Sequence, residues 1–315
     1  MSSQLQSLSD ISPINSAKPF LKWAGGKRQL IPQIEAHFPP ELFEGALTHY
    51  AEPFVGGGAM LFHIANLFPN LELTILDVNR EVFIVYKTIQ NDVKQLISYL
   101  GELETAYLSL SAENRQKFYY QRRTLFNSQL SEVNVTNYSA DWIIRAANII
   151  FLNRTCFNGL FRVNSKGEFN VPFGRYKNPK ICDQENLVHV SNVLKRCQII
   201  HGDFSSIDKF VNSQSFVYFD PPYRPISSTA SFNSYSEDTF GDESQLRLAN
   251  FFERLHKKGA KLILSDSDPK HTNPDDNLFE DAYRKFRIER VFANRNINSS
   301  GSKRGAISEL LIMNY

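Results

Sequence analysis

The residues with the clearest chemical potential are the tetrapeptide Asp220-Pro221-Pro222-Tyr223, which follows a short apolar run at residues 216–219. Two consecutive prolines remove two backbone N–H donors and fix two φ angles, so an acid and an aromatic ring are held on a stiff turn after a buried strand. The carboxylate and a backbone carbonyl of this turn can accept both hydrogens of an exocyclic amine, while the ring stacks on the base that carries it. The tetrapeptide therefore predicts chemistry on the amino group of a nucleobase.

A glycine triplet at residues 56–58 ends an earlier predicted strand and suits the close approach of a ligand to the backbone. Asp77 ends the next predicted strand about 20 residues later, where an acid commonly binds ribose hydroxyls. The triplet alone is equally typical of a tight strand-to-helix turn, but with Asp77 at this spacing we predict a cofactor that contains a nucleoside. The pattern is not G-x-G-x-x-G, which weakens the case for a pyrophosphate-containing cofactor such as NAD.

A third predicted strand ends at Asp203 and Phe204, an acid and a ring that suit hydrogen bonding to an adenine and stacking on it. Asp203 is equally suited to cap a helix that begins at Ser205, so both roles stay open. The cofactor contacts predicted from these strand ends are Glu52, Pro53, Phe54, Gly56, Asp77, Asp203 and Phe204.

The elements that must position these residues form two α/β segments that flank a different middle. Strand, glycine-rich turn, helix, strand and acid follow one another as in the βαβ unit of a nucleotide-binding sheet. Strands are predicted at 48–55, 71–76, 198–201, 216–219, 261–264, 287–293 and 307–314, and helices at 29–37, 59–67, 81–126, 142–153 and 246–256. We predict a flexible leader (1–18), a discontinuous catalytic domain (19–80 and 187–315) and an inserted recognition domain (81–186).

The middle segment contains a predicted β-hairpin, because two short runs at 157–163 and 168–172 flank a polar turn with a glycine. Arg162 on this hairpin suits a two-stranded ribbon in the major groove, where arginine pairs with guanine, although an edge-strand charge that discourages aggregation is the alternative. The basic residues Arg175, Lys177 and Lys180 suit phosphates. The polar loop at 294–304 either closes on DNA or is a plain hairpin loop.

Length and composition limit the number of domains and the class of protein. With 315 residues, 42% of them hydrophobic, the chain has room for one large domain or two moderate ones. No apolar run approaches the roughly 18 residues of a membrane span. The three scattered cysteines predict neither a metal site nor a disulfide framework, which favours the cytoplasm. The net charge of +2 says little about nucleic acid.

Three ordered motifs together resemble the DNA adenine methyltransferase (Dam) family over nearly all of residues 20–315. They are Phe20-Leu21-Lys22-Trp23-Ala24-Gly25-Gly26-Lys27, Glu52-Pro53-Phe54-Val55-Gly56-Gly57-Gly58 and Asp220-Pro221-Pro222-Tyr223. The resemblance implies an α/β, Rossmann-like, S-adenosylmethionine-dependent methyltransferase fold with an inserted helical and β-hairpin target-recognition domain. It also implies methyl transfer from S-adenosylmethionine to the amino group of adenine in double-stranded DNA. The motif order is similar to the alpha type.

Residue roles follow from the same resemblance. It implies that Trp23 and Lys27 contact the cofactor, Lys27 through the methionine carboxylate, that Asp77 binds the ribose, and that Asp220 borders both cofactor and target. The implied DNA contacts are Lys22 at the first guanine, Leu160, Arg162 and Pro172 at base-reading positions, Phe157 and Asn158 beside the flipped base, and Arg175, Tyr176 and Lys177 along the phosphates. Phe157 stands where some relatives carry tyrosine, which keeps stacking but removes a hydroxyl. Residues 153–180 resemble the hairpin of members that read GATC, including restriction–modification methyltransferases, and GATATC stays open.

The adenine amino nitrogen is a poor nucleophile, because its lone pair is delocalised into the ring. If Asp220 and the Pro221 carbonyl accept its two hydrogens, the lone pair is freed, and Tyr223 can stack on a base that has left the duplex. No metal is required for this chemistry. The alternatives are methylation of an amino group on RNA or on a protein glutamine, a DNA-binding module without catalysis, and an NAD oxidoreductase. We expect a monomer, with a companion restriction endonuclease or a solitary role equally open.

Overall fold

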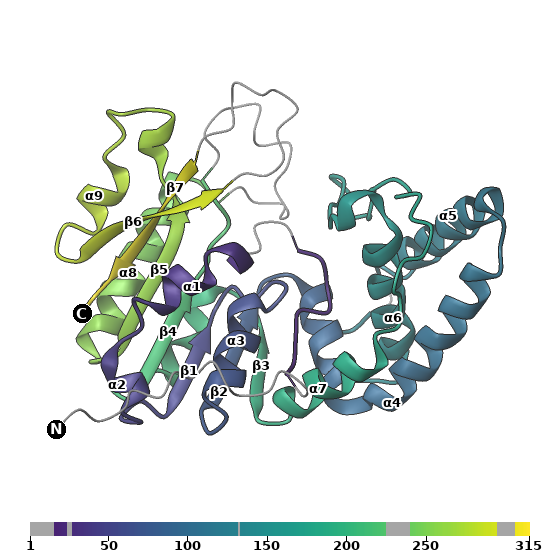
Figure 1. Cartoon of the computed structure of the whole chain (residues 1–315), viewed down its shortest axis with the longest axis horizontal. Helices are drawn as coiled ribbons and strands as arrows, with labels where there is room; N and C mark the ends of the chain where they lie inside the picture. The colour runs from purple at the N-terminus through teal and green to yellow at the C-terminus, as the bar shows by residue number, and fades with distance from the viewer. Residues whose placement is uncertain (1–15, 24–26, 132, 225–239, 295–305) are drawn as a thin grey trace, which may run out of the picture.

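The computed structural model describes residues 16–23, 27–131, 133–224, 240–294 and 306–315, and a seven-stranded sheet forms the centre of this part of the chain (Figure 1). The strand order is β3-β2-β1-β4-β5-β7-β6. Pairs β1–β2, β1–β4, β2–β3 and β4–β5 are parallel, and β7 runs antiparallel to β5 and β6. The strands are β1 (His49–Glu52), β2 (Glu72–Asp77), β3 (Cys197–His201), β4 (Ser215–Phe219), β5 (Lys261–Ser267), β6 (Arg287–Asn294) and β7 (Ala306–Met313). The order reverses between β1 and β4, as in the predicted Rossmann-like fold.

Helices cover both faces of the sheet. On one face, Leu61 of α3 and Ile84 of α4 share a core with Phe216, whereas Phe252 of α8 packs with Val217 on the other. The helices of the described residues are α1 (Ile31–Glu35), α2 (Pro40–Phe43), α3 (Ala59–Leu67), α4 (Arg80–Leu108), α5 (Ala112–Ser128), α6 (Asp141–Thr155), α7 (Gln184–Leu194), α8 (Asp242–Lys257) and α9 (Leu278–Ala282). None of them combines the length and the apolar character that a membrane crossing requires.

Strand β4 explains why the run before Asp220 is apolar throughout. Phe216 and Tyr218 face the core on the α3 side of the sheet, whereas Val217 and Phe219 face the core beneath α8. All five residues of β4 are buried. A central strand of a parallel sheet is covered on both faces, so its sequence loses the alternation of polar and apolar residues. The prediction of a buried strand at this position is confirmed.

Helices α4, α5 and α6 gather beside the sheet together with the segment that follows them (Figure 1). Helix α6 is buried along nearly its whole length, and its buried residues include the polar Arg145, Asn148 and Asn153. The predicted helical stretch at 81–126 is two helices, α4 and α5. The second helix begins after Ser111, whose side chain accepts a hydrogen bond from the backbone N–H of Asn114 and caps α5.

The prediction that the first limb of the hairpin begins at Phe157 is wrong, because Phe157–Gly159 form a 3₁₀ turn rather than a strand. Asn158 and Gly159 have φ angles of 55° and 64°, which an extended strand cannot accommodate. The two limbs do pair nearer the tip, where Val163 and Phe169 form an antiparallel bridge. Helices α2, α7 and α9 were not predicted, and the helix expected at 29–37 is a 3₁₀ turn at Lys27–Gln29 followed by α1.

Two predicted regions lie largely outside the described residues. These are residues 1–15 of the leader and residues 295–304 of the loop between β6 and β7. At the described end of the leader, Ala17 is buried, and the backbone of Lys18 exchanges two hydrogen bonds of 2.9 Å with the side-chain amide of Asn186 in α7.

Candidate active site

The ends of β1 and β4 lie side by side where the strand order reverses. The register pairs Ala51 of β1 with Val217 of β4, so the loop that starts at Pro53 lies beside the turn that starts at Asp220. Ligands of open α/β sheets bind in the crevice at such a reversal, outside the carboxyl ends of the strands. The topology therefore brings together the two motifs that the sequence placed in one site.

Asp220 lies against a buried cation, Lys27. The Lys27 ammonium is 3.6 Å from Oδ1 of Asp220 and also pairs with Oε2 of Glu309. Lys27 is only 4% exposed. Burial lowers the pKa of Lys27, but the attraction of Asp220 and Glu309 outweighs it and raises this pKa above its ordinary value. The ammonium therefore stays charged at neutral pH, and its charge is shared between two carboxylates.

Asp220 has an elevated pKa. Burial raises the pKa of Asp220 to about 6, with a further contribution from Glu309, although Lys27 and Ser265 act in the opposite direction. The side chain is 24% exposed, so it still reaches solvent. A carboxylate that is ionised at neutral pH but poorly hydrated is a strong hydrogen-bond acceptor. Asp220 is thus suited to accept a hydrogen from an incoming amine.

Two acids of this cluster, Glu309 of β7 and Asp266 of β5, were missed by the sequence analysis. Glu309 accepts a 3.0 Å hydrogen bond from the hydroxyl of Tyr223, whose ring centroid lies 4.5 Å from the Lys27 ammonium. Asp266 is fully buried, which raises its pKa to about 7, and accepts a 2.8 Å hydrogen bond from Gln245. One available signal for Glu309 is an acid inside the otherwise apolar run of β7.

Asp77 ends β2 and faces the glycine loop. Its Oδ2 accepts a 2.9 Å hydrogen bond from the N–H of Gly56, and its Oδ1 accepts one of 2.8 Å from the N–H of Asn79. Burial raises the pKa of Asp77 to about 6, and these two donors limit the rise. A carboxylate oxygen has two lone-pair positions, so each oxygen keeps capacity for a further donor such as a hydroxyl.

The glycine loop is shaped around Trp23. A Cβ atom on Gly56 would lie 2.8 Å from Nε1 of Trp23, and one on Gly57 would lie 2.8 Å from its Cβ. Gly56 also has a φ of 46°, a conformation that side chains disfavour. Trp23 stacks on Phe161 at a ring-centroid distance of 5.5 Å. The indole therefore joins the loop after β1 to the segment that carries the predicted DNA contacts.

The remaining predicted cofactor residues have partners within the protein. Asp203 caps the 3₁₀ turn at Phe204–Phe210, so its predicted capping role is confirmed. Asp203 also accepts two hydrogen bonds from Arg247, at 3.0 and 2.6 Å. The guanidinium of Arg247 lies 4.2 Å from the ring centroid of Phe204, which is 3% exposed. A stacking role for this ring stays a prediction.

Glu52, Pro53 and Phe54 line the start of the loop after β1. Glu52 is buried, accepts a 2.8 Å hydrogen bond from the hydroxyl of Tyr50, and has a pKa raised well above the ordinary range by burial. Pro53 is buried, and Phe54 packs on Phe204 with ring centroids 5.5 Å apart. These contacts fix the shape of the loop, and direct cofactor contacts from them stay predictions.

Lys22 is held against the segment that carries the other predicted DNA contacts. Asn153 holds the backbone of Lys22 through a 2.8 Å hydrogen bond in each direction. The Lys22 ammonium lies 4.3 Å from the ring centroid of Tyr176. Phe157 is 50% exposed, and the adjacent Asn158 has a left-handed backbone. Half of the Phe157 ring is therefore available for contact, and its insertion beside a flipped base stays a prediction.

The base-reading and phosphate-side candidates lie farther along the same segment. Arg162 donates from Nε to Oδ1 of Asn170 at 2.7 Å, which orients the guanidinium across the two limbs. Leu160 is half-buried, and Pro172 is exposed. Arg175 and Lys177 are also exposed, and Arg175 has a φ of 57°.

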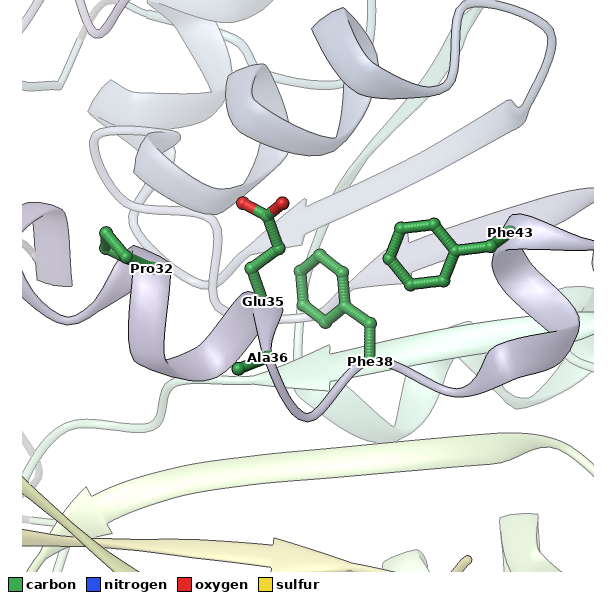
Figure 2. Close-up of a pocket in the computed structure, with 5 residues that line it drawn as sticks. All are labelled: Pro32, Glu35, Ala36, Phe38 and Phe43. Atoms are coloured by element: carbon green, nitrogen blue, oxygen red, sulfur yellow. The ribbon is translucent and has the colours of Figure 1, made fainter. Parts of the chain in front are cut away.

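A hollow of about 400 Å³ lies elsewhere, between α1 and α2 (Figure 2). It is lined by Pro32, Glu35, Ala36, Phe38 and Phe43. The ring of Phe38 contacts Phe216 near the start of β4, whereas Asp220 follows the end of that strand. The hollow contains none of the predicted site residues and is separate from the candidate active site.

Comparisons with known proteins agree with the chemistry of this site. The family model of the D12 class N6 adenine-specific DNA methyltransferases matches residues 23–297. The chain is 50% identical to the type II methyltransferase M.MjaIII of Methanocaldococcus jannaschii, over 95% of this chain and 99% of that protein. It is 38% identical to the type II methyltransferase M1.LlaDCHI of Lactococcus lactis subsp. cremoris (95% of each chain) and 31% identical to the DNA adenine methylase of Escherichia coli strain K12 (94% and 95%). The chain belongs to the D12 class of N6 adenine-specific DNA methyltransferases.

Proposed function

We propose that this enzyme methylates the N6 amino group of adenine within GATC in double-stranded DNA, with S-adenosylmethionine as methyl donor and with the target base flipped out of the duplex. The observation that carries the proposal is the position of Asp220. It follows β4 at the reversal of the sheet, beside the glycine loop of β1, with the Lys27 ammonium 3.6 Å away. An acid and a nucleoside-binding loop are thus combined in one crevice.

The charges at this edge of the sheet suit a cationic cofactor. Burial raises the pKa of three acids here, Asp77, Asp220 and Asp266, so a positive charge nearby would stabilise their ionised forms. S-adenosylmethionine supplies an activated methyl group on a positively charged sulfur. Asp77 has acceptor capacity for the ribose hydroxyls, and the Trp23 indole lies against the glycine loop that would receive the nucleoside.

The contacts of Lys27 support a second role beside the cofactor contact implied by the family resemblance. In the described residues its ammonium is paired with Asp220 and Glu309, so it would have to leave one of them to bind a methionine carboxylate. We propose that Lys27 chiefly keeps Asp220 ionised, because its attraction lowers the pKa of Asp220 against the effect of burial. A shared contact with the cofactor is compatible with this role.

The protein contributes acceptors and a stacking surface to the reaction. Asp220 accepts one hydrogen of the target amino group and the Pro221 carbonyl accepts the other, which draws the nitrogen toward tetrahedral geometry and frees its lone pair. Tyr223, 37% exposed and held by Glu309, presents its ring to the flipped base. An adenine amino group inside a duplex is paired and stacked, so the base must leave the helix to reach these groups.

The DNA-reading half of the proposal is the segment 153–180 within a recognition unit at 81–186. Arg162 is the candidate for bidentate pairing with guanine. We predict that Arg162→Ala relaxes discrimination at one base pair by about 1–3 kcal/mol, measured as methylation rates on sites with single substitutions. Uniform weakening on all sites would instead assign Arg162 to a phosphate.

Sequencing of modified bases in DNA from cells that express the enzyme, and lack other adenine methylation, tests the proposal directly. We expect N6-methyladenine in GATC from the natural enzyme, and none from Asp220→Ala, although this variant should still bind duplex DNA. The exposed Asp275 supplies a matched control, Asp275→Ala, which should methylate normally. Methylation at another motif such as GATATC would refute the GATC proposal alone, and turnover by Asp220→Ala would remove Asp220 from the mechanism.

Several properties of the system follow as proposals. The relatives with type II names support pairing with a restriction endonuclease that cleaves the same site, without direct contact between the two proteins. A monomer is sufficient, because the two strands of a palindrome can be methylated in separate events. We place this activity in the cytoplasm, where bacterial and archaeal DNA is accessible.

A further inference from the structure

Helix α5 carries a line of polar side chains that bind the backbone of the predicted recognition segment. They are Arg115, Tyr119, Arg123 and Asn127, one at every fourth position, and we call them the α5 row. Residues at this spacing share one face of an α-helix. Within the 17 residues of α5, only Tyr119 and Phe126 are buried, so apolar packing alone does not explain how this helix docks.

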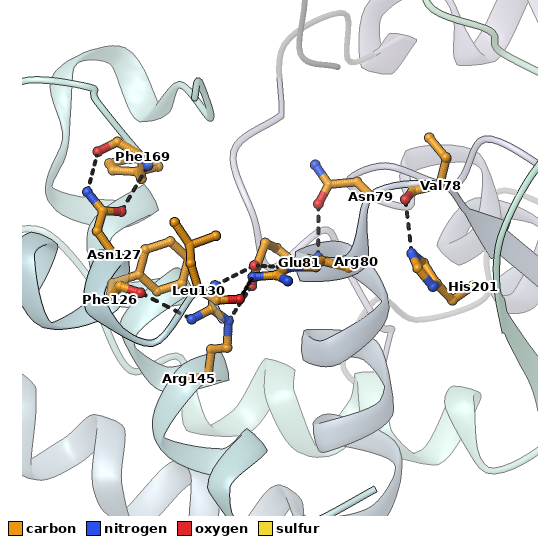
Figure 3. A network of polar contacts seen from close by, with 10 residues as sticks. All are labelled: Val78, Asn79, Arg80, Glu81, Phe126, Asn127, Leu130, Arg145, Phe169 and His201. Carbon is orange, nitrogen blue, oxygen red and sulfur yellow. Dashed lines mark hydrogen bonds and ion pairs between the residues drawn. The ribbon is translucent and has the colours of Figure 1, made fainter. Parts of the chain in front are cut away.

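Each member of the row donates to a backbone carbonyl. Asn127 exchanges two hydrogen bonds with Phe169, donating to its carbonyl at 3.0 Å and accepting from its N–H at 2.9 Å (Figure 3). The Tyr119 hydroxyl and Nη1 of Arg123 donate to the carbonyl of Val171 at 2.7 and 3.3 Å.

The row continues at the other end of the helix, where Nη1 of Arg115 donates to the carbonyl of Lys177 at 2.6 Å. Residue numbers on the segment therefore rise as those on α5 fall, so the two run antiparallel.

The row takes the place of a third strand beside the hairpin. On the inner edge of the second limb, the Glu168 carbonyl accepts from the N–H of Asn164 at 2.9 Å, and the N–H of Asn170 donates to the carbonyl of Arg162 at 3.0 Å. The backbone N–H and C=O groups of successive residues alternate between the two edges of a strand. Phe169 and Val171 therefore direct their backbone groups to the outer edge. The α5 row supplies partners for both backbone groups of Phe169 and for the carbonyl of Val171 on that edge.

This arrangement fixes which side chains face outward. Phe169 and Val171 are buried, whereas Asn170 and Pro172 point away from the core. A strand that slipped by one residue would exchange these two sets, because side chains alternate with a period of two. Asn170 in turn orients Arg162 through the 2.7 Å hydrogen bond to its Nε.

The row is also connected to the catalytic sheet. In the network of Figure 3, Arg145 donates to the carbonyl of Phe126 at 3.1 Å and forms a buried ion pair with Glu81. The N–H of Glu81 donates to the side chain of Asn79, whose own N–H donates to Asp77. The helix that holds the hairpin is thereby joined, through buried and partly buried polar contacts, to the end of β2.

From these contacts we infer that the α5 row is a set of positioning residues for sequence discrimination, which set the register of the second hairpin limb through its backbone. The inference rests on the proposed function, in which Arg162 and Pro172 face the bases. A loosened limb lets those side chains adapt to a wrong base, so discrimination falls, while the residues around Asp220 remain in place.

Tyr119→Phe tests the inference with the smallest change, since it removes one hydroxyl and leaves the buried ring. We expect the ratio of kcat/KM between cognate DNA and sites with one altered base to fall about 3- to 10-fold, because a hydrogen bond of about 1 kcal/mol is lost. Asn127→Ala, which loses two hydrogen bonds, should have a larger effect. The kcat on cognate DNA should stay within about twofold of the natural enzyme.

Gln121→Ala, at an exposed position of the same helix, is the matched control and should leave discrimination unchanged. Hydrogen exchange should quicken at the amides of Phe169 and its neighbours in Tyr119→Phe and not in Gln121→Ala. Faster exchange with unchanged discrimination would overturn the inference, and so would a fall in kcat on cognate and altered sites alike.

A double variant separates this inference from the proposed function. If the row acts through Arg162, then Tyr119→Phe should cause little further loss of discrimination in an Arg162→Ala background. Full additivity would contradict the inference. If Arg162→Ala alone leaves discrimination unchanged, the base-reading role in the proposed function fails instead.

Discussion

Replacing Asp220 with asparagine should stabilise the protein while it slows methylation. The pKa of Asp220 is about 6, compared with an ordinary value of 3.8, and each pKa unit corresponds to about 1.4 kcal/mol. Ionising this carboxylate in the folded protein therefore costs about 3 kcal/mol more than in the unfolded chain. Solvent reaches a quarter of the side chain and screens part of this cost, so we expect a gain of about 1–3 kcal/mol for the neutral amide.

The size of the stability gain depends on pH. A raised carboxyl pKa means that the folded protein binds more protons than the unfolded chain between about pH 4 and 6, so its stability falls as the pH rises through this window. Asparagine resembles the protonated acid, and its advantage should be complete above about pH 6 and absent near pH 4. A gain of this size corresponds to roughly 2–5 °C in melting temperature for a protein of this length.

Thermal unfolding of both proteins at pH 7.5 and pH 4 measures this gain, and Asp275→Asn, at an exposed position, is the control that should change little. Methylation should slow about tenfold or more, because a neutral amide oxygen accepts a weaker hydrogen bond than a carboxylate. The reasoning is refuted if Asp220→Asn is no more stable at pH 7.5, or if its advantage persists unchanged at pH 4.

Two further predictions concern the neighbours of this carboxylate. Glu309→Gln removes a charge that raises the pKa of Asp220. The acid limb of the pH dependence of kcat/KM, expected near pH 6, should therefore move to lower pH. An unchanged acid limb would show that Glu309 does not influence the pKa of Asp220. Gly56→Ala should weaken S-adenosylmethionine binding at least tenfold by displacing Trp23, as measured by calorimetry. Gly45→Ala has a similar left-handed φ but no atom near its Cβ, so an equal loss there would assign the effect to backbone strain.

Much of the sheet could be predicted because local patterns decide it. The buried run of β4, the glycine turn before α3 and the acid at the end of β2 each occupy a few consecutive residues, and α3 begins and ends where the sequence predicted. The errors arise where tertiary contacts override the pattern. The run at 157–163 alternates like a strand, yet the left-handed Asn158 and Gly159 turn its start into a 3₁₀ turn against the Lys22 segment.

The polar partners in the site could not be predicted for a different reason. Glu309 lies 282 residues after Lys27 in the sequence. The two side chains meet because β7 pairs with β5, which brings Glu309 to the edge of the sheet where the turn at Asp220 follows β4. The α5 row has a regular spacing, but its partners are backbone carbonyls, which carry no sequence signature. A stripe of polar side chains on a helix is normally interpreted as a solvent-facing surface. Here the same stripe faces protein, because the outer edge of a two-stranded hairpin needs donors and the helix supplies them. Sequence patterns therefore predict candidates for ligand contact, whereas the residues that position those candidates become recognisable only when the backbone they support is known.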